Sequence, residues 1–366
     1  METASGVPKA EKKPRIGIVR LSSLGDVIHG TPVSRALREH FGPSAYIAWT
    51  VEKAFAEVLQ GNPYLDDLII WERGTGLQGF LDFVRRLRAA RLEMTLDIQG
   101  LWKSGWTALL SGAKTRFGYE RSREWSKYFA NVLLDSRNKG KGLGIVDQYL
   151  DVVAQATGYV APSKDFVLCL SEQERSWAEE WYAAHGLTPH RGTAVICPGS
   201  SAYIRCWIEE WYAELIEWMA DSHGLHTVLL GTQHDAQVIR AIADRAAVPV
   251  TQCVGESSIR ESAALIGLAE LYVGGDTGPT YLAAAVGAPI VGIFGSTKNN
   301  GKLTNPDRHI ALESSLPCTS VVCYQFNCKT KECMRDIPLE RVRDACQSLL
   351  QRSAQTAGAK GGSQTP

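Results

Sequence analysis

The sequence LYVGGDTGPTYLAAAVGAPIVGIFGST, residues 271–297, predicts a strand, a glycine-rich turn, a helix and a second strand in succession. Leu271–Val273 is a short apolar run, and the glycines after it allow a tight turn close to a ligand. Pro279 can open a helix that covers Tyr281–Val286, and Ile290–Phe294 is the next strand. The N–H groups of such a turn and of the helix N-terminus can hold an anionic diphosphate.

Asp276 lies in this turn, at the carboxyl end of a predicted strand, where α/β sheets bind their ligands. A diphosphate does not explain a carboxylate at this place. A hydroxyl-rich group, such as the sugar of a nucleotide-sugar, does explain it. The alternative is that Asp276 caps the helix, and the residues alone leave both interpretations open.

The composition is that of a soluble globular protein with room for two domains. The 366 residues are 45% hydrophobic and 21% charged, and basic and acidic residues balance to a net charge of zero. This balance argues against a nucleic-acid partner. No apolar run reaches the roughly 18 residues of a membrane span. The polar N-terminus is unlike a secretory signal, so we expect a cytoplasmic protein with reduced thiols.

Strands and helices alternate along both halves of the chain. The expected strands are residues 16–21, 46–49, 68–71 and 94–98 in the first half, and 193–197, 227–230, 271–273 and 290–294 in the second. Helical patterns between them are typical of doubly wound parallel sheets. The predicted fold is α/β, with two Rossmann-like domains whose parallel sheets face each other across a cleft. The expected limits are a disordered tail at 1–14, domains at 15–165 and 166–352, a linker at 162–170 that runs into an edge strand, and a disordered tail at 353–366.

Residues 114–141 interrupt this alternation. They carry eight basic residues against three acidic ones, and five aromatic residues. A basic, aromatic segment in a neutral chain favours an anionic partner. The alternative interpretation is a solvated surface loop.

A second candidate site follows the first predicted strand, where Ser22-Ser23-Leu24-Gly25-Asp26 leads into a helix. The stretch lacks the G-x-G-x-x-G spacing, so it gives little support to dinucleotide binding. Asp26 lies near the helix start, where the helix dipole favours an ionised carboxylate that can take a proton from an acceptor hydroxyl. The alternative is again that Asp26 only caps the helix.

The loop after the strand at 193–197 carries a third group. Ser200, Ser201 and Arg205 supply two hydroxyls and a permanent cation, which together can clamp phosphate oxygens and neutralise a leaving diphosphate. Residues 231–235, GTQHD, follow the next strand and are placed to meet a ribose or a base.

Four stretches resemble the ADP-heptose:lipopolysaccharide heptosyltransferases, a family of GT-B glycosyltransferases. They are RLSSLGDVIHGTPV (20–33), LDIQGLWKSG (96–105), PGSSAYIRCW (198–207) and GGDTGPTYLAAAVGAPIVGIFGST (274–297). The resemblance covers about residues 15–350. The second stretch and the basic segment after it are most similar to the heptosyltransferase I type, which adds the first heptose to the Kdo region of the inner core.

The resemblance implies an inverting transfer of a heptosyl group from ADP-heptose to the Kdo or inner-core region of a lipopolysaccharide precursor, without a metal. Asp26 matches the proposed general base of the family. The positions assigned to the donor are Ser200, Ser201, Arg205, Gln233, Asp235, Asp276, Thr277, Gly278 and Tyr281, and those assigned to the anionic glycolipid acceptor are Ser23, Gly25, Gln99, Lys103, Arg121 and Arg123.

Tyr281 departs from the family pattern. It stands three residues after the donor-binding Asp-Thr-Gly, where the family usually has His. A phenol donates a hydrogen bond but stays neutral near neutral pH. Either the enzyme uses a different ADP-sugar or acceptor from the usual ones, or this residue acts only by its shape.

Four cysteines near the C-terminus, Cys318, Cys323, Cys328 and Cys333, are separated by four residues each. Four thiolates could close a structural zinc site. However, the spacing is not the usual C-x2-C pair, and similar cysteine-rich tails occur in the family without a metal. We therefore expect a reduced loop or a disulfide there, and no cofactor.

Other functions remain open from the residues alone. A nucleotide-sugar epimerase or hydrolase would need a second acid–base group across the cleft, for which Asp276 or His29 could serve. A non-catalytic glycolipid binder and a nicotinamide dehydrogenase are further alternatives. Trp102, Trp106 and Trp125, with the basic segment, permit peripheral contact with an anionic inner-membrane surface.

Overall fold

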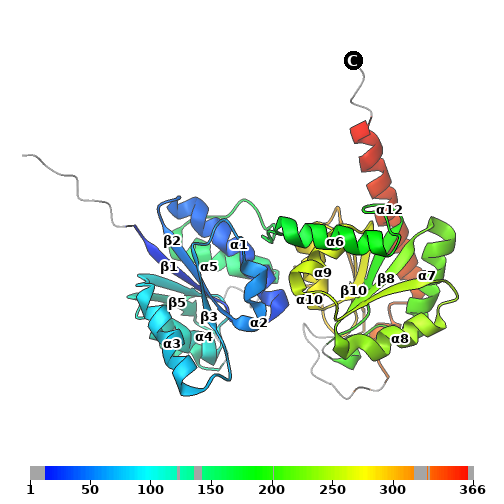
Figure 1. Ribbon diagram of the computed structural model, residues 1–366. Helices are drawn as coiled ribbons and strands as arrows, with labels where there is room; N and C mark the ends of the chain where they lie inside the picture. Colours follow the sequence, from blue (N-terminus) through cyan, green and yellow to red (C-terminus); the bar gives the residue numbers. More distant parts are fainter. Residues whose placement is uncertain are drawn as a thin grey trace, which may run out of the picture.

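The chain folds into two lobes, each built on a six-stranded parallel sheet (Figure 1). The computed structural model describes residues 13–121, 124–135, 142–200, 202–316, 328 and 330–361. The predicted α/β fold with two Rossmann-like domains is confirmed. None of the described helices combines the length and the apolar character that crossing a bilayer requires.

The N-terminal lobe has the strand order β3-β2-β1-β4-β5-β6. Its strands are β1 (Arg15–Val19), β2 (Tyr46–Glu52), β3 (Asp67–Trp71), β4 (Met94–Asp97), β5 (Thr115–Tyr119) and β6 (Val132–Leu134), and its helical segments are α1 (Leu24–Phe41), α2 (Lys53–Ala56), η1 (Glu57–Leu59), α3 (Gly76–Ala89), α4 (Trp102–Leu110), η2 (Ser126–Phe129) and α5 (Ile145–Thr157). Ile16 and Ile18 of β1 are fully buried. The continuous apolar run of this strand is what a parallel strand covered by helices on both faces requires.

The C-terminal lobe has the strand order β12-β11-β10-β7-β8-β9. Its strands are β7 (Thr193–Cys197), β8 (His226–Gly231), β9 (Val250–Val254), β10 (Leu271–Gly275), β11 (Ile290–Phe294) and β12 (His309–Glu313). Its helical segments are α6 (Glu172–Ala184), η3 (Tyr203–Arg205), α7 (Glu209–His223), η4 (Gln233–Asp235), α8 (Ala236–Arg245), α9 (Ile259–Gly267), α10 (Gly278–Ala285), α11 (Glu332–Arg335) and α12 (Leu339–Gly361). Val273 of β10 pairs with Ile196 of β7 on one side and Val291 of β11 on the other.

The two sheets share one topology, because the winding direction reverses between β1 and β4 in one lobe and between β7 and β10 in the other. Parallel α/β sheets bind ligands beyond the carboxyl ends of their strands at such a reversal. The loops after β1 and β10 lead into α1 and α10, and these two helices contact each other across the lobes. Each lobe therefore turns its expected ligand-binding edge toward the other.

The segment at 114–141 differs in part from its prediction. It does interrupt the β–α alternation, because the short turn η2 replaces a helix between β5 and β6. Its two strands nevertheless belong to the N-terminal sheet, since β5 pairs with β4 and β6 pairs with β5. Phe129 of η2 packs on Trp102 and Trp106 of α4, where a covering helix would otherwise lie.

Two other segment predictions are wrong. The linker at 162–170 contains no strand. Its Val167 N–H donates to the hydroxyl of Thr31 in α1 (2.9 Å) and not to a neighbouring strand. At the C-terminus, α12 continues to Gly361 through residues expected to be disordered. Residues 1–12 and 362–366 lie outside the described part of the chain.

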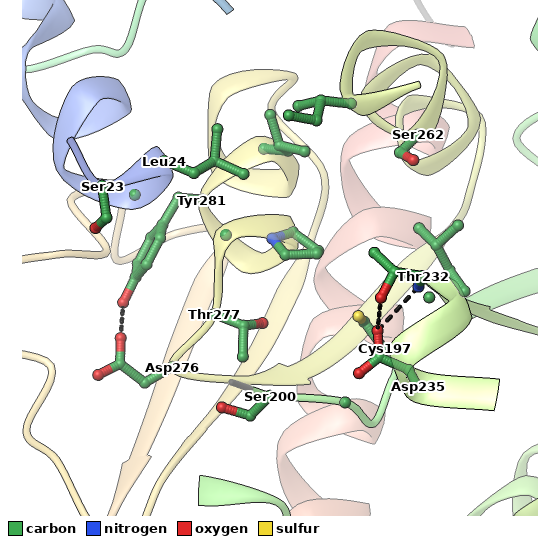
Figure 2. Close-up of a pocket in the computed structure, with 18 of the residues that line it drawn as sticks. Ser23, Leu24, Cys197, Ser200, Thr232, Asp235, Ser262, Asp276, Thr277 and Tyr281 are labelled. Atoms are coloured by element: carbon green, nitrogen blue, oxygen red, sulfur yellow. Dashed lines mark hydrogen bonds between the residues drawn. The ribbon is translucent and has the colours of Figure 1, made fainter. Parts of the chain in front are cut away.

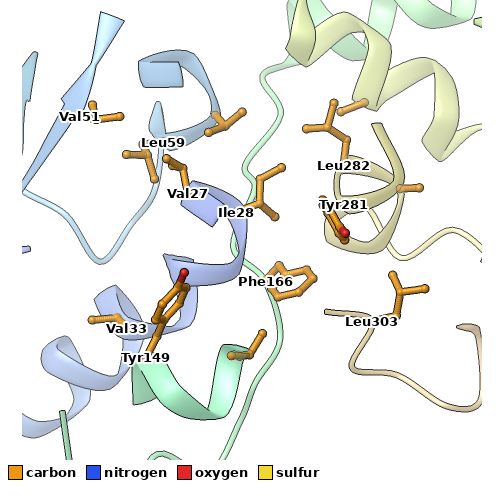
Figure 3. Close-up of a cluster of buried hydrophobic side chains, with 14 of the residues drawn as sticks. Val27, Ile28, Val33, Val51, Leu59, Tyr149, Phe166, Tyr281, Leu282 and Leu303 are labelled. Atoms are coloured by element: carbon orange, nitrogen blue, oxygen red, sulfur yellow. The ribbon is translucent and has the colours of Figure 1, made fainter. Parts of the chain in front are cut away.

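Close packing joins the lobes beside the two ligand-binding edges. Figure 3 shows Ile28 of α1 and Phe166 of the linker facing Tyr281 and Leu282 of α10. A Cβ atom on Gly25 would lie only 2.6 Å from a ring carbon of Tyr281. Glycine at this position therefore lets the start of α1 approach α10 directly.

A buried arginine holds the lobes together at a second place. Arg260 of α9 donates to the carbonyl oxygens of Glu57 and Gln60 in the N-terminal lobe, both at 3.0 Å. It also forms an ion pair with Glu174 of α6. The guanidinium can make all these contacts at once because its donors form a planar fork.

Candidate active site between the two lobes

A cavity of about 790 Å³ lies between the lobes. This volume suits a ligand of the size of a nucleotide-sugar. The N-terminal wall consists of Ser23, Leu24, Gly25, Asp26, His29 and Phe55, and the C-terminal wall includes Ser200, Arg205, Thr232, Asp235, Asp276, Thr277, Gly278, Tyr281 and Lys302. Figure 2 shows Ser23 and Leu24 at one end of this cavity and Thr232 and Asp235 at the other.

Asp26 has two roles at the N-terminal wall. It is the third residue of α1, and its carboxylate accepts hydrogen bonds from the N–H (3.3 Å) and the hydroxyl (3.0 Å) of Ser23. Asp26 is therefore not the N-cap residue, which is Ser23, but it completes a capping box with it, and this is not its only role. The same carboxylate lines the cavity, and its side chain is 36% exposed.

A buried arginine sets the charge of Asp26. Burial by itself would raise the pKa of this carboxyl, but the Arg20 guanidinium, 2.6 Å away, acts together with His29 and the hydrogen bonds from Ser23, and the pKa is lowered. Arg20 is fixed in turn by a hydrogen bond to the carbonyl oxygen of Ile98 (3.2 Å) and by the ring of Tyr149. Asp26 is consequently an ionised carboxylate with a fixed orientation.

Asp276 does not cap α10. The N-cap residue is Thr277. The carboxylate of Asp276 instead accepts a hydrogen bond from the phenol of Tyr281 and forms an ion pair with Lys302 at 2.7 Å. Burial would raise the pKa of Asp276, but Lys302 and the hydrogen bonds lower it. The interpretation of Asp276 as a helix cap is therefore wrong, and the residue is an ionised group of the cavity wall.

Sequence reasoning missed Lys302. It lies 26 residues after its partner Asp276, in the loop that follows β11, where no motif marks it. Only the pairing of β10 with β11 brings the two loops side by side. Its ammonium group also lies 5.5 Å from the ring centre of Phe294.

We expect the substitution Lys302→Met to lower the free energy of unfolding at neutral pH by about 3 kcal/mol, because a buried carboxylate loses its cation. The folded-state pKa of Asp276 is below its unfolded value. The ion pair therefore contributes stability above an unfolded pKa of about 3.9, and this stability is lost as the pH falls through the folded pKa. Urea unfolding at several pH values should show the difference between the two proteins shrinking toward acid pH.

A matched control for this substitution is Lys53→Met. Lys53 and Glu72 are also 2.7 Å apart, but both side chains are more than half exposed. Such a pair should contribute no more than about 1 kcal/mol. Equal losses in the two variants would show that the Asp276 pair is not buried in solution.

Unpartnered donors face the cavity near Asp276. The hydroxyls of Ser200 and Thr277 and the Nε of Arg205 are buried and have no hydrogen-bond partner among the described residues. The Arg205 side chain forms no hydrogen bond or ion pair with any described part of the chain. The N-terminus of α10 adds its unpaired N–H groups to this wall. Such a set of donors is complementary to an anion such as a diphosphate.

Asp235 and Gln233, which were both assigned to the donor, have different positions. Asp235 lines the cavity, and its carboxylate accepts from the N–H (2.9 Å) and the hydroxyl (2.7 Å) of Thr232. Gln233 does not line the cavity, because its amide donates to the carbonyl oxygen of Val254 at 3.0 Å. Figure 2 shows Asp235 and Thr232 joined at the end of the cavity away from Ser23.

Three of the positions assigned to the acceptor do not line this cavity. Gln99 accepts a hydrogen bond from the N–H of Leu21 (2.8 Å), and Lys103 donates one to the hydroxyl of Ser22 (2.5 Å). Both side chains therefore hold the loop before Asp26 in place. Arg121 is exposed at the end of β5. Two further predicted residues, Ser201 and Arg123, lie outside the described part of the chain.

His29 lines the cavity but is only 2% exposed. Neither of its ring nitrogens has a hydrogen-bond partner among the described residues. Burial lowers the pKa of His29 to about 4, so the imidazole is neutral at ordinary pH. Its ring meets that of Tyr281 edge-on, with the centroids 4.2 Å apart.

The cysteine cluster cannot be described as a unit. Cys318 and Cys323 lie outside the described residues, whereas Cys328 and Cys333 are within them. Among the residues that the structure describes, no group of three or more His, Cys, Asp or Glu side chains is arranged to hold a metal ion.

Comparison with known proteins gives one consistent result. The family glycosyltransferase family 9 (heptosyltransferase) matches residues 80–334. The chain is 25% identical to lipopolysaccharide heptosyltransferase 1 of Pseudomonas aeruginosa, over 92% of this chain and 94% of that protein.

Solved structures of this family share the fold. A family 9 glycosyltransferase from Veillonella parvula superimposes with a TM-score of 0.79 at 22% identity, covering 92% of this chain and 97% of the other. The Escherichia coli heptosyltransferase WaaC, solved with ADP-2-deoxy-2-fluoro heptose, superimposes with a TM-score of 0.68 at 21% identity, covering 91% and 99%.

Proposed function

The chain belongs to glycosyltransferase family 9, the heptosyltransferase family, and is a glycosyltransferase; from this premise we propose that it moves a heptosyl group from ADP-heptose to the Kdo or inner-core region of a lipopolysaccharide precursor. The observation that carries the proposal is that Asp26 of one lobe and Asp276 and Arg205 of the other line a single cavity. The name of the Pseudomonas aeruginosa relative and the ADP-heptose analogue bound by WaaC support this choice of acceptor and donor.

In the proposed reaction, Asp26 is the general base. Its ionised carboxylate takes the proton of an acceptor hydroxyl as the oxygen of that hydroxyl attacks the anomeric carbon of the donor. The new carbon–oxygen bond forms on the face opposite ADP, and the bond from the anomeric carbon to the diphosphate breaks. ADP leaves with the electron pair, and the sugar configuration inverts.

The donors on the C-terminal wall are proposed to stabilise the departing diphosphate. Arg205 supplies a positive charge, while the hydroxyls of Ser200 and Thr277 and the N-terminus of α10 supply hydrogen bonds. A protein cation and N–H groups can neutralise this charge, so the proposed reaction requires no metal. Asp235, at the far end of the cavity, is proposed to meet the adenosine ribose.

Asp276 is proposed to bind hydroxyl groups of the donor sugar. Tyr281 and Lys302 hold its carboxylate, and the remaining lone pairs can accept from a sugar. The pKa of Tyr281 is raised well above its usual value, chiefly by burial and then by Asp276, so the phenol remains a donor. Tyr281 therefore acts by hydrogen bonding as well as by shape, and a donor other than the usual heptose remains the alternative within the same family.

A thermal-shift series with ADP, UDP, GDP and NAD tests the nucleotide part of this proposal. We expect ADP alone to raise the melting temperature, because a ligand at about one hundred times its Kd stabilises the folded state by about 2.7 kcal/mol. An equal or larger shift with UDP or GDP would contradict an ADP-sugar donor.

Product analysis tests the reaction itself. With ADP-heptose and a Kdo-containing acceptor, we expect release of ADP together with a heptosylated acceptor. With the acceptor left out, the donor should remain intact. Free heptose or an epimerised donor under the second condition would instead indicate a hydrolase or an epimerase.

A further inference from the structure

We propose that one face of the N-terminal lobe docks on the surface of an anionic lipid bilayer. This docking face is formed by Trp102, Trp106 and Leu109 of α4 and by Trp125 and Tyr128 at η2. The inference rests on the proposed function, in which the acceptor is a lipid-linked sugar. It names the surface by which the protein would reach that acceptor at the cytoplasmic face of the inner membrane.

Exposed apolar side chains gather on this part of the molecule. Among the described residues, eleven large hydrophobic side chains are exposed, and all but Val160 and Tyr203 lie between residues 77 and 133. Trp125 is 74% exposed and Tyr128 is 73% exposed. An accumulation of this kind on one lobe, absent from the described surface of the other, marks an interaction surface.

The two elements that carry the docking face pack against each other. Trp102, Trp106 and Leu109 follow one another at intervals of four and three residues, which places them on one side of α4. The rings of Trp102 and Trp106 lie 4.8 and 5.7 Å from that of Phe129 in η2, measured between centroids. Phe129 thus joins α4 to the turn that carries Tyr128.

The charge around this face is complementary to an anionic surface. Residues 114–129, which carry Trp125 and Tyr128, contain five Lys and Arg against two Asp and Glu, whereas the whole chain is neutral. Lys114 and Arg121 are exposed, and the ammonium group of Lys127 lies 5.3 Å from the centre of the Tyr128 ring. Trp and Tyr rings beside basic side chains are typical of proteins that lie at a lipid interface. A protein–protein interface would instead be depleted of Lys at its centre.

Helix α4, which carries part of the docking face, also supports the loop before the proposed base. Lys103, next to Trp102 in α4, donates to the hydroxyl of Ser22, and the following residue, Ser23, bonds to Asp26. This arrangement suits an acceptor whose lipid part stays in the membrane while its sugar reaches Asp26.

Vesicle co-sedimentation of the full chain tests the proposal. We expect binding to vesicles of phosphatidylcholine mixed with phosphatidylglycerol, weaker binding to phosphatidylcholine alone, and a decrease with added salt. The double variant Trp125→Ser/Tyr128→Ser should bind the mixed vesicles roughly tenfold more weakly, because it loses two interfacial rings. The control Val160→Ser removes a side chain that is 78% exposed outside this face, and it should bind like the wild type.

Several outcomes would overturn the proposal. Wild-type protein that does not bind the mixed vesicles would do so, as would a double variant that binds as the wild type does. Sedimentation equilibrium showing a dimer that the variant lacks would assign the face to a second copy of the chain instead. The single variant Tyr128→Ser, which should weaken binding in the same direction, repeats the test if the double variant does not fold.

Turnover on a soluble, lipid-free acceptor separates this inference from the proposed function. We expect the double variant to match the wild type in that assay, since neither substituted residue lines the cavity. Absence of turnover in the wild type with intact vesicle binding would contradict the proposed function alone. Normal turnover without vesicle binding would contradict the docking face alone.

Discussion

Replacement of Asp26 by asparagine should lower kcat by roughly one hundred- to ten-thousand-fold and leave the Kd for ADP unchanged. The amide of asparagine can keep the capping contacts with Ser23, but it cannot take a proton from the acceptor hydroxyl. The Kd should not change, because the donors that face the diphosphate belong to the other lobe. Single-turnover kinetics with ADP-heptose and acceptor, together with calorimetry of ADP binding, measure the two quantities.

The loss of charge at residue 26 also affects stability. The variant leaves the buried Arg20 without its carboxylate, which should cost about 1–2 kcal/mol. This is below the roughly 3–5 kcal/mol of a fully buried pair, since Asp26 is partly exposed to solvent in the cavity. Turnover should therefore be compared at a temperature at which both proteins are folded.

Asp82→Asn is the matched control for this prediction. It makes the same chemical change at an exposed carboxylate of α3, which is paired with Arg85 outside the cavity. We expect wild-type kinetics from it. Wild-type turnover in Asp26→Asn would remove Asp26 as the base, and the reaction would then need another proton acceptor among the groups of the cavity wall.

The second large effect is expected from Arg205→Gln, which should lower kcat/KM by roughly one hundred- to one thousand-fold and raise the Kd for ADP. Glutamine removes the permanent positive charge that would meet the diphosphate. The free energy of unfolding should change little, because Arg205 has no ion pair within the described chain to lose. Kinetics and calorimetry on one preparation, with a urea titration, measure all three quantities.

Two further variants give the Arg205 prediction its control and its rescue. Arg205→Lys should recover part of the activity, since it restores the charge but not the planar fork of donors. Arg240→Gln changes an exposed arginine of α8 and should have no effect on ADP binding. If Arg205→Gln bound ADP as tightly as the wild type, the diphosphate would have to lie elsewhere in the cavity.

The local elements followed from patterns in the sequence, because each depends on neighbouring residues. The strands at 193–197 and 290–294 lie where their apolar runs predicted them. The helix predicted to follow the first strand forms as α1, and Asp26 lies in its first turn. The linker was mispredicted, since its contact with α1 decides its structure. The predicted disordered tail was wrong in part, since α12 continues without a break from its buried first turns to Gly361.

The residue types of the site could also be read in part from the sequence. A carboxylate or hydroxyl in a loop after a buried strand will lie at the carboxyl edge of a parallel sheet, and this reasoning led to Asp26, Ser200 and Asp276. It gave no means of finding Lys302 or Arg20 as their ionic partners. Ion pairs between loops far apart in the chain leave no pattern in either loop.

Chain order and side-chain chemistry thus specified two parallel-sheet lobes and the loops that carry their polar groups, because periodicity, glycine turns and strand ends are properties of short segments. The packing of α1 on α10 decided which of those loops share a cavity, and it brought Gly25 against Tyr281. Contacts within each lobe decided that Gln99, Lys103 and Gln233 support the walls without lining them. These outcomes depend on distances between residues that are remote in sequence, and only the folded chain sets such distances.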